Sequence, residues 1–127
     1  MPFARLTLIP APAPEQASRL AAELTDLIAG DLGKRHDLTS ILIETPGEAL
    51  WTIGGQPRAS AAHLEVCVTA GTNSGEEKRT FVANAMRMLK AALPGLDPAT
   101  YVIVKEMPGS DWGFDGRTQA DRARERN

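Results

Sequence analysis

The sequence predicts an α+β fold in which one βαβ unit occurs twice, giving a four-stranded sheet with two helices on one face. The first observation is the order of elements, since strand-like, helix-like and strand-like stretches follow one another and then recur in the same order. The second is a repeat, because the pattern Glu, any residue, Pro, Gly at residues 44–47 recurs 62 positions later at 106–109. A period of this length indicates duplication of one supersecondary unit. We therefore expect a single domain over residues 1–127, with units at about 1–62 and 63–120.

The first unit is predicted from its hydrophobic spacing. Residues 3–9 alternate as a strand does, and a proline-rich run ends them because proline cannot donate to a sheet ladder. Residues 15–32 carry one apolar stripe at spacings of three and four, which is typical of an amphipathic helix. The stripe consists of Ala17, Leu20, Ala21, Leu24, Leu27 and Ile28. A second strand is expected at about 39–44, and the later pair Gly54-Gly55 indicates a short hairpin.

The second unit follows the same plan. A strand is expected at residues 63–69, a helix at 76–93 and a fourth strand at 101–106. The two strands of each unit are expected to be parallel and joined through the helix. Apolar residues on both sides of the strands predict that the face opposite the helices needs a cover, and oligomerisation is its simplest source. The charged tail at 117–127 is expected to fray, although its start may pack.

Composition excludes several classes of function. The net charge of −2 and the pI of about 5.7 give no support for a nucleic-acid partner. The sequence contains no signal-like or membrane-spanning apolar run, so a cytoplasmic protein without a membrane partner is the default expectation. Cys67 is the single cysteine and is expected to pack as a small hydrophobe. His36 and His63 lack the spacing of metal ligands, and no cofactor motif is present, so neither a metal nor a cofactor is predicted.

Pro2 stands directly before the first strand. Removal of Met1 would leave Pro2 with a free secondary amine, which the ring holds rigidly. An ordinary α-amino group titrates at about 7.7–8.0, and burial or neighbouring cations lower that pKa. A base with a pKa near the working pH suits general acid–base catalysis. If Met1 is retained, the Pro2 nitrogen is an amide without basicity, and Pro2 merely begins a strand.

Several short motifs resemble the tautomerase superfamily. Residues 38–55 resemble the end of a 4-oxalocrotonate tautomerase subunit, which has an aromatic residue followed by Gly-Ile-Gly-Gly. Gly33-Lys34 resembles the segment after the first helix of macrophage migration inhibitory factor, and residues 110–114 resemble the end of malonate semialdehyde decarboxylase. The order and spacing of these motifs agree along nearly the whole chain. The resemblance implies a homotrimer and a mechanism in which an amino-terminal proline moves a proton next to a carbonyl.

The resemblance also implies roles for individual residues. Pro2 matches the catalytic base, Lys34 matches the lysine beside it, and Tyr101 matches a tyrosine early in the fourth strand. Trp51 matches an aromatic residue of the substrate pocket. Each match has an alternative that stays open. Lys34 would be a solvated lysine whose charge suits the helix dipole, Tyr101 would be a core or interface residue, and Trp51 would only pack within its hairpin.

The residue that binds a substrate carboxylate is not settled by the sequence. Arg117 is the best candidate, because it follows the second hairpin tryptophan, Trp112, which would also line the substrate site. Arg79 and Arg58 are further candidates, and all three arginines have an alternative interpretation as surface charges.

The departures from the family patterns bear on the reaction. The two arginines of 4-oxalocrotonate tautomerase have no clean match, since Thr72 and Ser40 fall near those places. The paired arginines after the third strand of the decarboxylase and of cis-3-chloroacrylic acid dehalogenase are also missing. The dehalogenase's helix-one histidine is Ile28 here, and Asp37 lies within a residue of the decarboxylase's water-activating aspartate. These differences argue against hydrolytic dehalogenation and decarboxylation.

The sequence therefore predicts a cofactor-free tautomerase or isomerase of small 2-oxo or enol acids, with Pro2 as the general base. One alternative keeps Pro2 but uses it as an acid, in a hydratase, dehalogenase or decarboxylase. The other is a non-catalytic oligomeric binding protein that has kept the fold.

Overall fold

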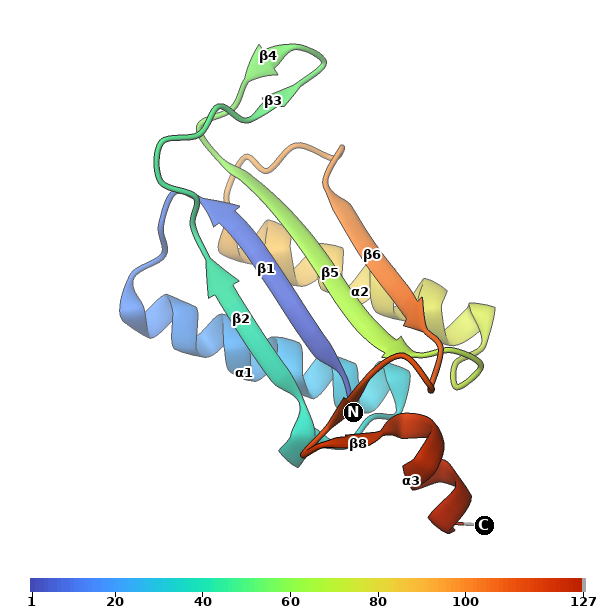
Figure 1. The fold of residues 1–127 in the computed structure, drawn as a ribbon. Helices are drawn as coiled ribbons and strands as arrows, with labels where there is room; N and C mark the ends of the chain where they lie inside the picture. The colour runs from blue at the N-terminus through green and yellow to red at the C-terminus, as the bar shows by residue number, and fades with distance from the viewer. Residues whose placement is uncertain (127) are drawn as a thin grey trace.

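The protein, described by a computed structural model over residues 1–126, is a mixed four-stranded sheet with two long helices on one face (Figure 1). The strands lie in the order β2-β1-β5-β6. They are β1 (Phe3–Ile9), β2 (Ser40–Glu44), β5 (Ala61–Thr69) and β6 (Tyr101–Met107). The pairs β1–β2 and β5–β6 are parallel, whereas the central strands β1 and β5 are antiparallel. Each parallel pair belongs to one repeat unit, so the predicted duplicated architecture is confirmed.

One helix joins the strands of each unit, α1 (Pro14–Leu32) in the first and α2 (Gly75–Ala92) in the second. Both lie within one residue of their predicted bounds. α2 begins with a capping box, in which the Ser74 hydroxyl accepts from the backbone N–H of Glu77 and the Glu77 carboxylate accepts from that of Ser74. α1 ends at Gly33, whose φ of 64° lets the chain turn sharply toward the start of β2. No helix within residues 1–126 is both long enough and apolar enough to cross a membrane.

The core lies between the sheet and the helices. Alternate residues of β1 and β5 are fully buried against the apolar stripes of α1 and α2, as their period of two predicts. The largest fully buried side chains of this core are Phe81, Leu6, Leu8, Leu24, Ile28, Leu32, Leu64 and Leu89. This core fixes β1, and therefore its first residues, in the middle of the sheet.

The face of the sheet opposite the helices is mixed rather than uniformly apolar. Phe3, Leu42 and Ile103 are apolar residues there that remain more than a third exposed. Arg5 forms an ion pair with Glu44 across the same face, at 2.9 Å between Nε and Oε1. The expectation of apolar residues on both sides of the strands is therefore met only in part.

Two short hairpins and one further helix complete the chain. The first hairpin pairs β3 (Thr52–Ile53) with β4 (Gln56–Pro57), and the second pairs β7 (Gly113–Phe114) with β8 (Arg117–Thr118). A 3₁₀ turn, η1 (His36–Leu38), precedes β2.

The charged tail differs from the expectation that it frays, because it forms the helix α3 (Gln119–Arg126) beside the chain's first residue (Figure 1). The backbone N–H of Asp121 donates to the Thr118 hydroxyl at 3.0 Å and so caps the first turn. Residue 127 lies outside the described part of the chain.

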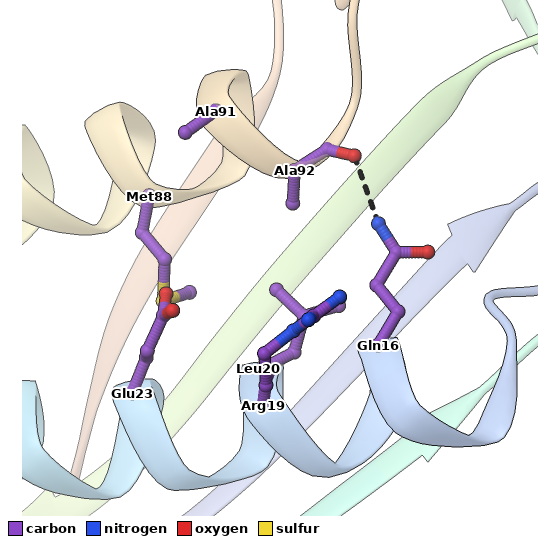
Figure 2. Close-up of a pocket in the computed structure, with 7 residues that line it drawn as sticks. All are labelled: Gln16, Arg19, Leu20, Glu23, Met88, Ala91 and Ala92. Carbon is purple, nitrogen blue, oxygen red and sulfur yellow. Dashed lines mark hydrogen bonds between the residues drawn. The ribbon is translucent and has the colours of Figure 1, made fainter.

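A shallow groove runs between α1 and α2 on the outer side of the helical layer (Figure 2). It encloses about 210 Å³ and is bridged by Gln16, whose side-chain amide donates to the carbonyl of Ala92 at 3.0 Å. None of the residues that the sequence marks as functional lines this groove.

Candidate active site

Pro2 lies directly before β1, at the end of the sheet where β2 begins and β5 ends. Its side chain is fully buried, and its carbonyl accepts a hydrogen bond from the backbone N–H of Ser40 at 3.2 Å. The next residue, Phe3, pairs with Ser40 on one side and with Cys67 on the other. Because both neighbouring strands hold this backbone, the position of the chain's start is fixed by the sheet itself.

Met1 forms part of the wall of a cavity of about 430 Å³, which we call the terminal cavity. Its walls come from the turn after α1, the end of β5, the β7–β8 hairpin and α3. The lining residues are Met1, Gly33, Lys34, Arg35, Leu38, Thr69, Thr72, Phe114, Gln119, Arg122, Ala123 and Arg126. Four of them are cationic and, within residues 1–126, none is a carboxylate. The cavity is therefore suited to an anionic ligand.

Lys34 is held on the wall by the turn at Gly33. Its ammonium donates to the Thr72 hydroxyl at 2.6 Å, and that hydroxyl donates in turn to the carbonyl of Thr69 at 2.6 Å. An ammonium has three donors, so this contact leaves two for a ligand. Burial lowers the pKa of Lys34, while the carboxylate of Glu77 acts in the opposite direction.

The α-amino group of the chain faces a positive environment. Burial is the largest cause that lowers the pKa of the Met1 amine below its ordinary value of 8.0. The charges of Lys34, Arg126 and Arg35 lower it further, in that order. An amine at this position is therefore neutral, and able to accept a proton, over a wider range of pH than an ordinary one.

α3 presents one face to the terminal cavity. Gln119, Arg122, Ala123 and Arg126 recur at spacings of three and four, which place them on one side of a helix. The Arg122 guanidinium stacks on the Phe114 ring at 3.8 Å from its centroid and donates to the carbonyl of Phe114 at 2.9 Å. These residues were not predicted from the sequence, although their spacing in the tail was the signal that could have identified them.

Two of the predicted site residues lie at the other end of the sheet. Tyr101 begins β6, and β6 runs antiparallel to β1 through β5, so its start lies far from Pro2. Tyr101 is 70% exposed and, with Trp51 and His63, lines a separate cavity of about 290 Å³, which we call the far cavity. Within a single chain, therefore, Tyr101 and Trp51 do not lie near Pro2 and Lys34.

The three remaining predicted residues do not line the terminal cavity. Arg117 forms a two-point ion pair with Glu125 of α3, which raises the pKa of the guanidinium. Trp112 donates its indole N–H to the Thr69 hydroxyl at 3.2 Å, which links the start of the second hairpin to the end of β5. Arg79 is exposed on α2 and lies outside the cavity wall.

Three other residues weighed from the sequence, Asp37, His36 and His63, do not line the cavity, although the partner of Asp37 does. Asp37 pairs with Arg35 at 2.7 Å, and His36 contacts Asp26 at 2.9 Å. His63 lies 3.7 Å from the carboxylate of Glu65. Within residues 1–126 there is no group of three or more His, Cys, Asp or Glu side chains that could hold a metal ion.

The chain is thus a duplicated βαβ protein with a cationic cavity beside its first residues. No protein-family model matches the chain, and no curated protein matches its sequence. Among solved structures, the asymmetric trimer of the wild-type fused 4-OT called F6 is similar, with a TM-score of 0.83 and 20% identity. That match covers 94% of this chain and 98% of the other.

Two further structures are similar over nearly the whole chain. The macrophage migration inhibitory factor-like protein of Entamoeba histolytica (EhMIF) has a TM-score of 0.78 and 20% identity, with 92% of this chain and 97% of the other covered. Pt0534 inactivated by 2-oxo-3-pentynoate has a TM-score of 0.84 and 12% identity, with 95% and 98% covered. The chain thus has the same fold as these proteins, which is the fold that its motifs predicted, and at these identities the likeness shows the fold alone.

Proposed function

We propose that the protein is a cofactor-independent tautomerase of small 2-oxo or enol acids that uses the secondary amine of Pro2 as its general base. The observation that carries this proposal is the position of the chain's start, which the sheet fixes beside a cavity where burial, and then the cations of the wall, lower the pKa of the Met1 amine. Removal of Met1 would free the proline nitrogen next to the part of the wall that Met1 now forms. The fold shared with fused 4-OT and the EhMIF protein supports the same assignment.

The proposed reaction needs a base and a group that stabilises negative charge. The neutral Pro2 nitrogen takes a proton from the enol oxygen or from the carbon beside the carbonyl, and returns it at the other atom. The Lys34 ammonium, which has two donors free of Thr72, stabilises the enolate oxygen as charge develops. Within residues 1–126 no carboxylate lines the cavity to activate water, so no observation favours the hydratase alternative.

The proposal includes self-association as a homotrimer. The similar fused 4-OT structure is a trimer, and the open sheet face here carries exposed apolar side chains that a second copy could cover. Tyr101 and Trp51, which lie at the far end of the sheet in their own chain, could then reach the terminal cavity of a neighbouring copy.

Two measurements on the native protein test the proposal. Intact mass shows whether Met1 is removed, and an assay of enol-to-keto conversion of phenylpyruvate compares the protein with Pro2→Ala. We expect loss of Met1 and a fall in kcat/KM of about 10³-fold, which is the usual contribution of a positioned base. Pro57→Ala, in the exposed β4 strand, is the matched control and should keep its activity. Full retention of Met1 in the native host would reject the catalytic role and favour the binding-protein alternative.

A further inference from the structure

Lys34 and the loop between β5 and α2, residues 70–74, belong to different repeat units but meet at the terminal cavity. The Lys34 ammonium donates to the Thr72 hydroxyl, with 2.6 Å between Nζ and Oγ1, and both residues line the cavity. Within residues 1–126 this is the one hydrogen bond that the Lys34 side chain makes. Thr72 is therefore the group of the described chain that fixes the direction of the ammonium.

The Thr72 hydroxyl has a single proton, and its neighbours show where that proton goes. The hydroxyl donates to the carbonyl of Thr69 at 2.6 Å, whereas the side-chain oxygen of Asn73 lies farther away, at 3.4 Å. A hydroxyl has one donor and two acceptor lone pairs, so the shorter bond leaves only lone pairs for other partners. Thr72 is thus suited to hold the Lys34 ammonium and not to donate to an anionic ligand itself.

The loop that carries Thr72 is tied to the fold on both sides. The Asn73 side-chain amide donates to the carbonyl of Leu32, the last residue of α1, at 2.8 Å. The backbone N–H of Ala70 donates to the carbonyl of Met107, the last residue of β6, at 2.8 Å. Because these bonds hold the loop against both elements, the Thr72 hydroxyl has a defined position on the cavity wall.

The environment of Lys34 shows why this contact matters. Burial lowers the pKa of Lys34 and so favours its neutral form. A hydrogen bond accepted from the ammonium stabilises the charged form and acts against the effect of burial. The charge of Glu77 acts in the same direction, but its carboxylate accepts from the backbone N–H of Ser74 and is not bonded to Lys34. The contact with Thr72 is therefore the direct one.

We propose that Thr72 is a positioning residue, whose hydroxyl, supplied by the second repeat unit, holds the Lys34 ammonium on the cavity wall with its two remaining donors free for the ligand. The inference rests on the proposed function, because that function assigns to Lys34 the stabilisation of the enolate. The contact between the two side chains can be tested without it.

The test replaces the hydroxyl by a methyl group of similar size. Thr72→Val removes both hydrogen bonds and keeps the branched shape, and the position is exposed, so the substitution does not threaten the core. Thr72→Ser restores the hydroxyl. Thr80→Val makes the same change at an exposed position of α2 that does not line the cavity, and is the matched control.

We expect Thr72→Val to lower kcat/KM for the enol of phenylpyruvate about tenfold, as the loss of a hydrogen bond to a charged group should. Lys34 acts only as a cation, so a lower pKa moves the basic limb of the kcat/KM profile to lower pH. Thr72→Ser should restore the rate and the profile, and Thr80→Val should change neither. A fall in rate without movement of the basic limb, an unchanged rate, or a serine variant that behaves like the valine variant overturns the proposal.

A titration makes failure of this proposal distinguishable from failure of the proposed function. The chain has four lysines, so in protein that contains isotope-labelled lysine the NMR signal of Lys34 is the one that Lys34→Gln lacks. The midpoint of its titration is measured in each variant. If the native protein converts no enol, the proposed function fails, and this midpoint alone decides about Thr72. A lower midpoint in Thr72→Val that returns in Thr72→Ser supports the positioning role, whereas an unchanged midpoint, or an equal change in Thr80→Val, overturns it.

Discussion

The two ends of the sheet are built from equivalent parts but differ in chemistry. Each end has a hairpin with a tryptophan, and Trp112 follows Trp51 by 61 positions. The period of 62 residues relates Pro2 to Leu64, so a buried internal leucine of the second unit stands where the first unit has Pro2. Duplication therefore supplies the scaffold twice, while Met1 and α3 line the cavity at one end only. The difference between the ends comes from these added segments rather than from the repeated fold.

The charges at the two ends show the same contrast. Near the far cavity, Arg58 is paired with Asp97 at 3.1 Å and His63 lies beside Glu65. At the terminal cavity, Lys34 and Arg126 have no carboxylate partner within residues 1–126. The cations Lys34 and Arg126 at the terminal cavity are therefore better placed than Arg58 to meet an anionic ligand.

The largest effect is expected from the hairpin that carries α3. A Cβ on Gly113 would lie 1.9 Å from the carbonyl oxygen of Arg117, which is part of the backbone of β8. Gly113→Ala must therefore separate β7 from β8 and displace α3 from the cavity. We expect a loss of about 3 kcal/mol in stability, typical of severe overpacking, and loss of tautomerase activity. Thermal unfolding and the phenylpyruvate assay measure the two effects.

The equivalent hairpin supplies the control for this prediction. Gly54 has a φ of 60°, but a Cβ there meets no atom within 4 Å. Gly54→Ala should cost about 1 kcal/mol for the left-handed backbone alone and leave α3 in place. Equal effects of the two substitutions on activity would show that α3 is not part of the site.

The next effect concerns the cations at the terminal cavity. Lys34→Gln should lower kcat/KM by about 10²-fold, because it removes the group that stabilises the enolate. The same change removes a positive charge that lowers the pKa of the terminal amine. The amine acts only when neutral, so a raised pKa moves the acidic limb of the kcat/KM profile to higher pH.

Arg79→Gln is the matched control for the Lys34 prediction, since Arg79 lies on an exposed helix surface. Removal of this surface charge should leave both the rate and the pH profile essentially unchanged. A profile of Lys34→Gln that moves to lower pH would contradict the role assigned to the terminal amine.

The fold could be predicted from the sequence because its repeated elements follow simple periods. The helices and strands bury alternating or three-to-four-spaced apolar residues, and the observed bounds differ from the predicted ones by at most two residues. The Gly54-Gly55 pair also marked its hairpin correctly, since both residues have positive φ.

The candidate site was only partly predictable, for two physical reasons. α3 is fixed by Gln119 and by Arg122 stacked on Phe114, and not by the aliphatic side chains whose spacing usually reveals a packed helix. Its charged sequence therefore looked like a solvated tail. Tyr101 and Trp51 were matched by local sequence, which does not say at which end of an antiparallel pair of units they lie.

The smallest effect is expected from the far end, and it tests whether the two ends meet between chains. Tyr101→Phe should lower kcat/KM about tenfold if the Tyr101 hydroxyl serves the terminal cavity of a neighbouring copy.

A mixing experiment tests this contact between chains. Pro2→Ala and Tyr101→Phe chains can be unfolded together and refolded in equal amounts. After random reassembly, about a quarter of all sites then combine an intact Pro2 with an intact Tyr101 from another chain. Activity well above the mean of the two separate variants is the expected result. Activity equal to that mean would confine Tyr101 to its own chain, where it lies too far from Pro2 to take part.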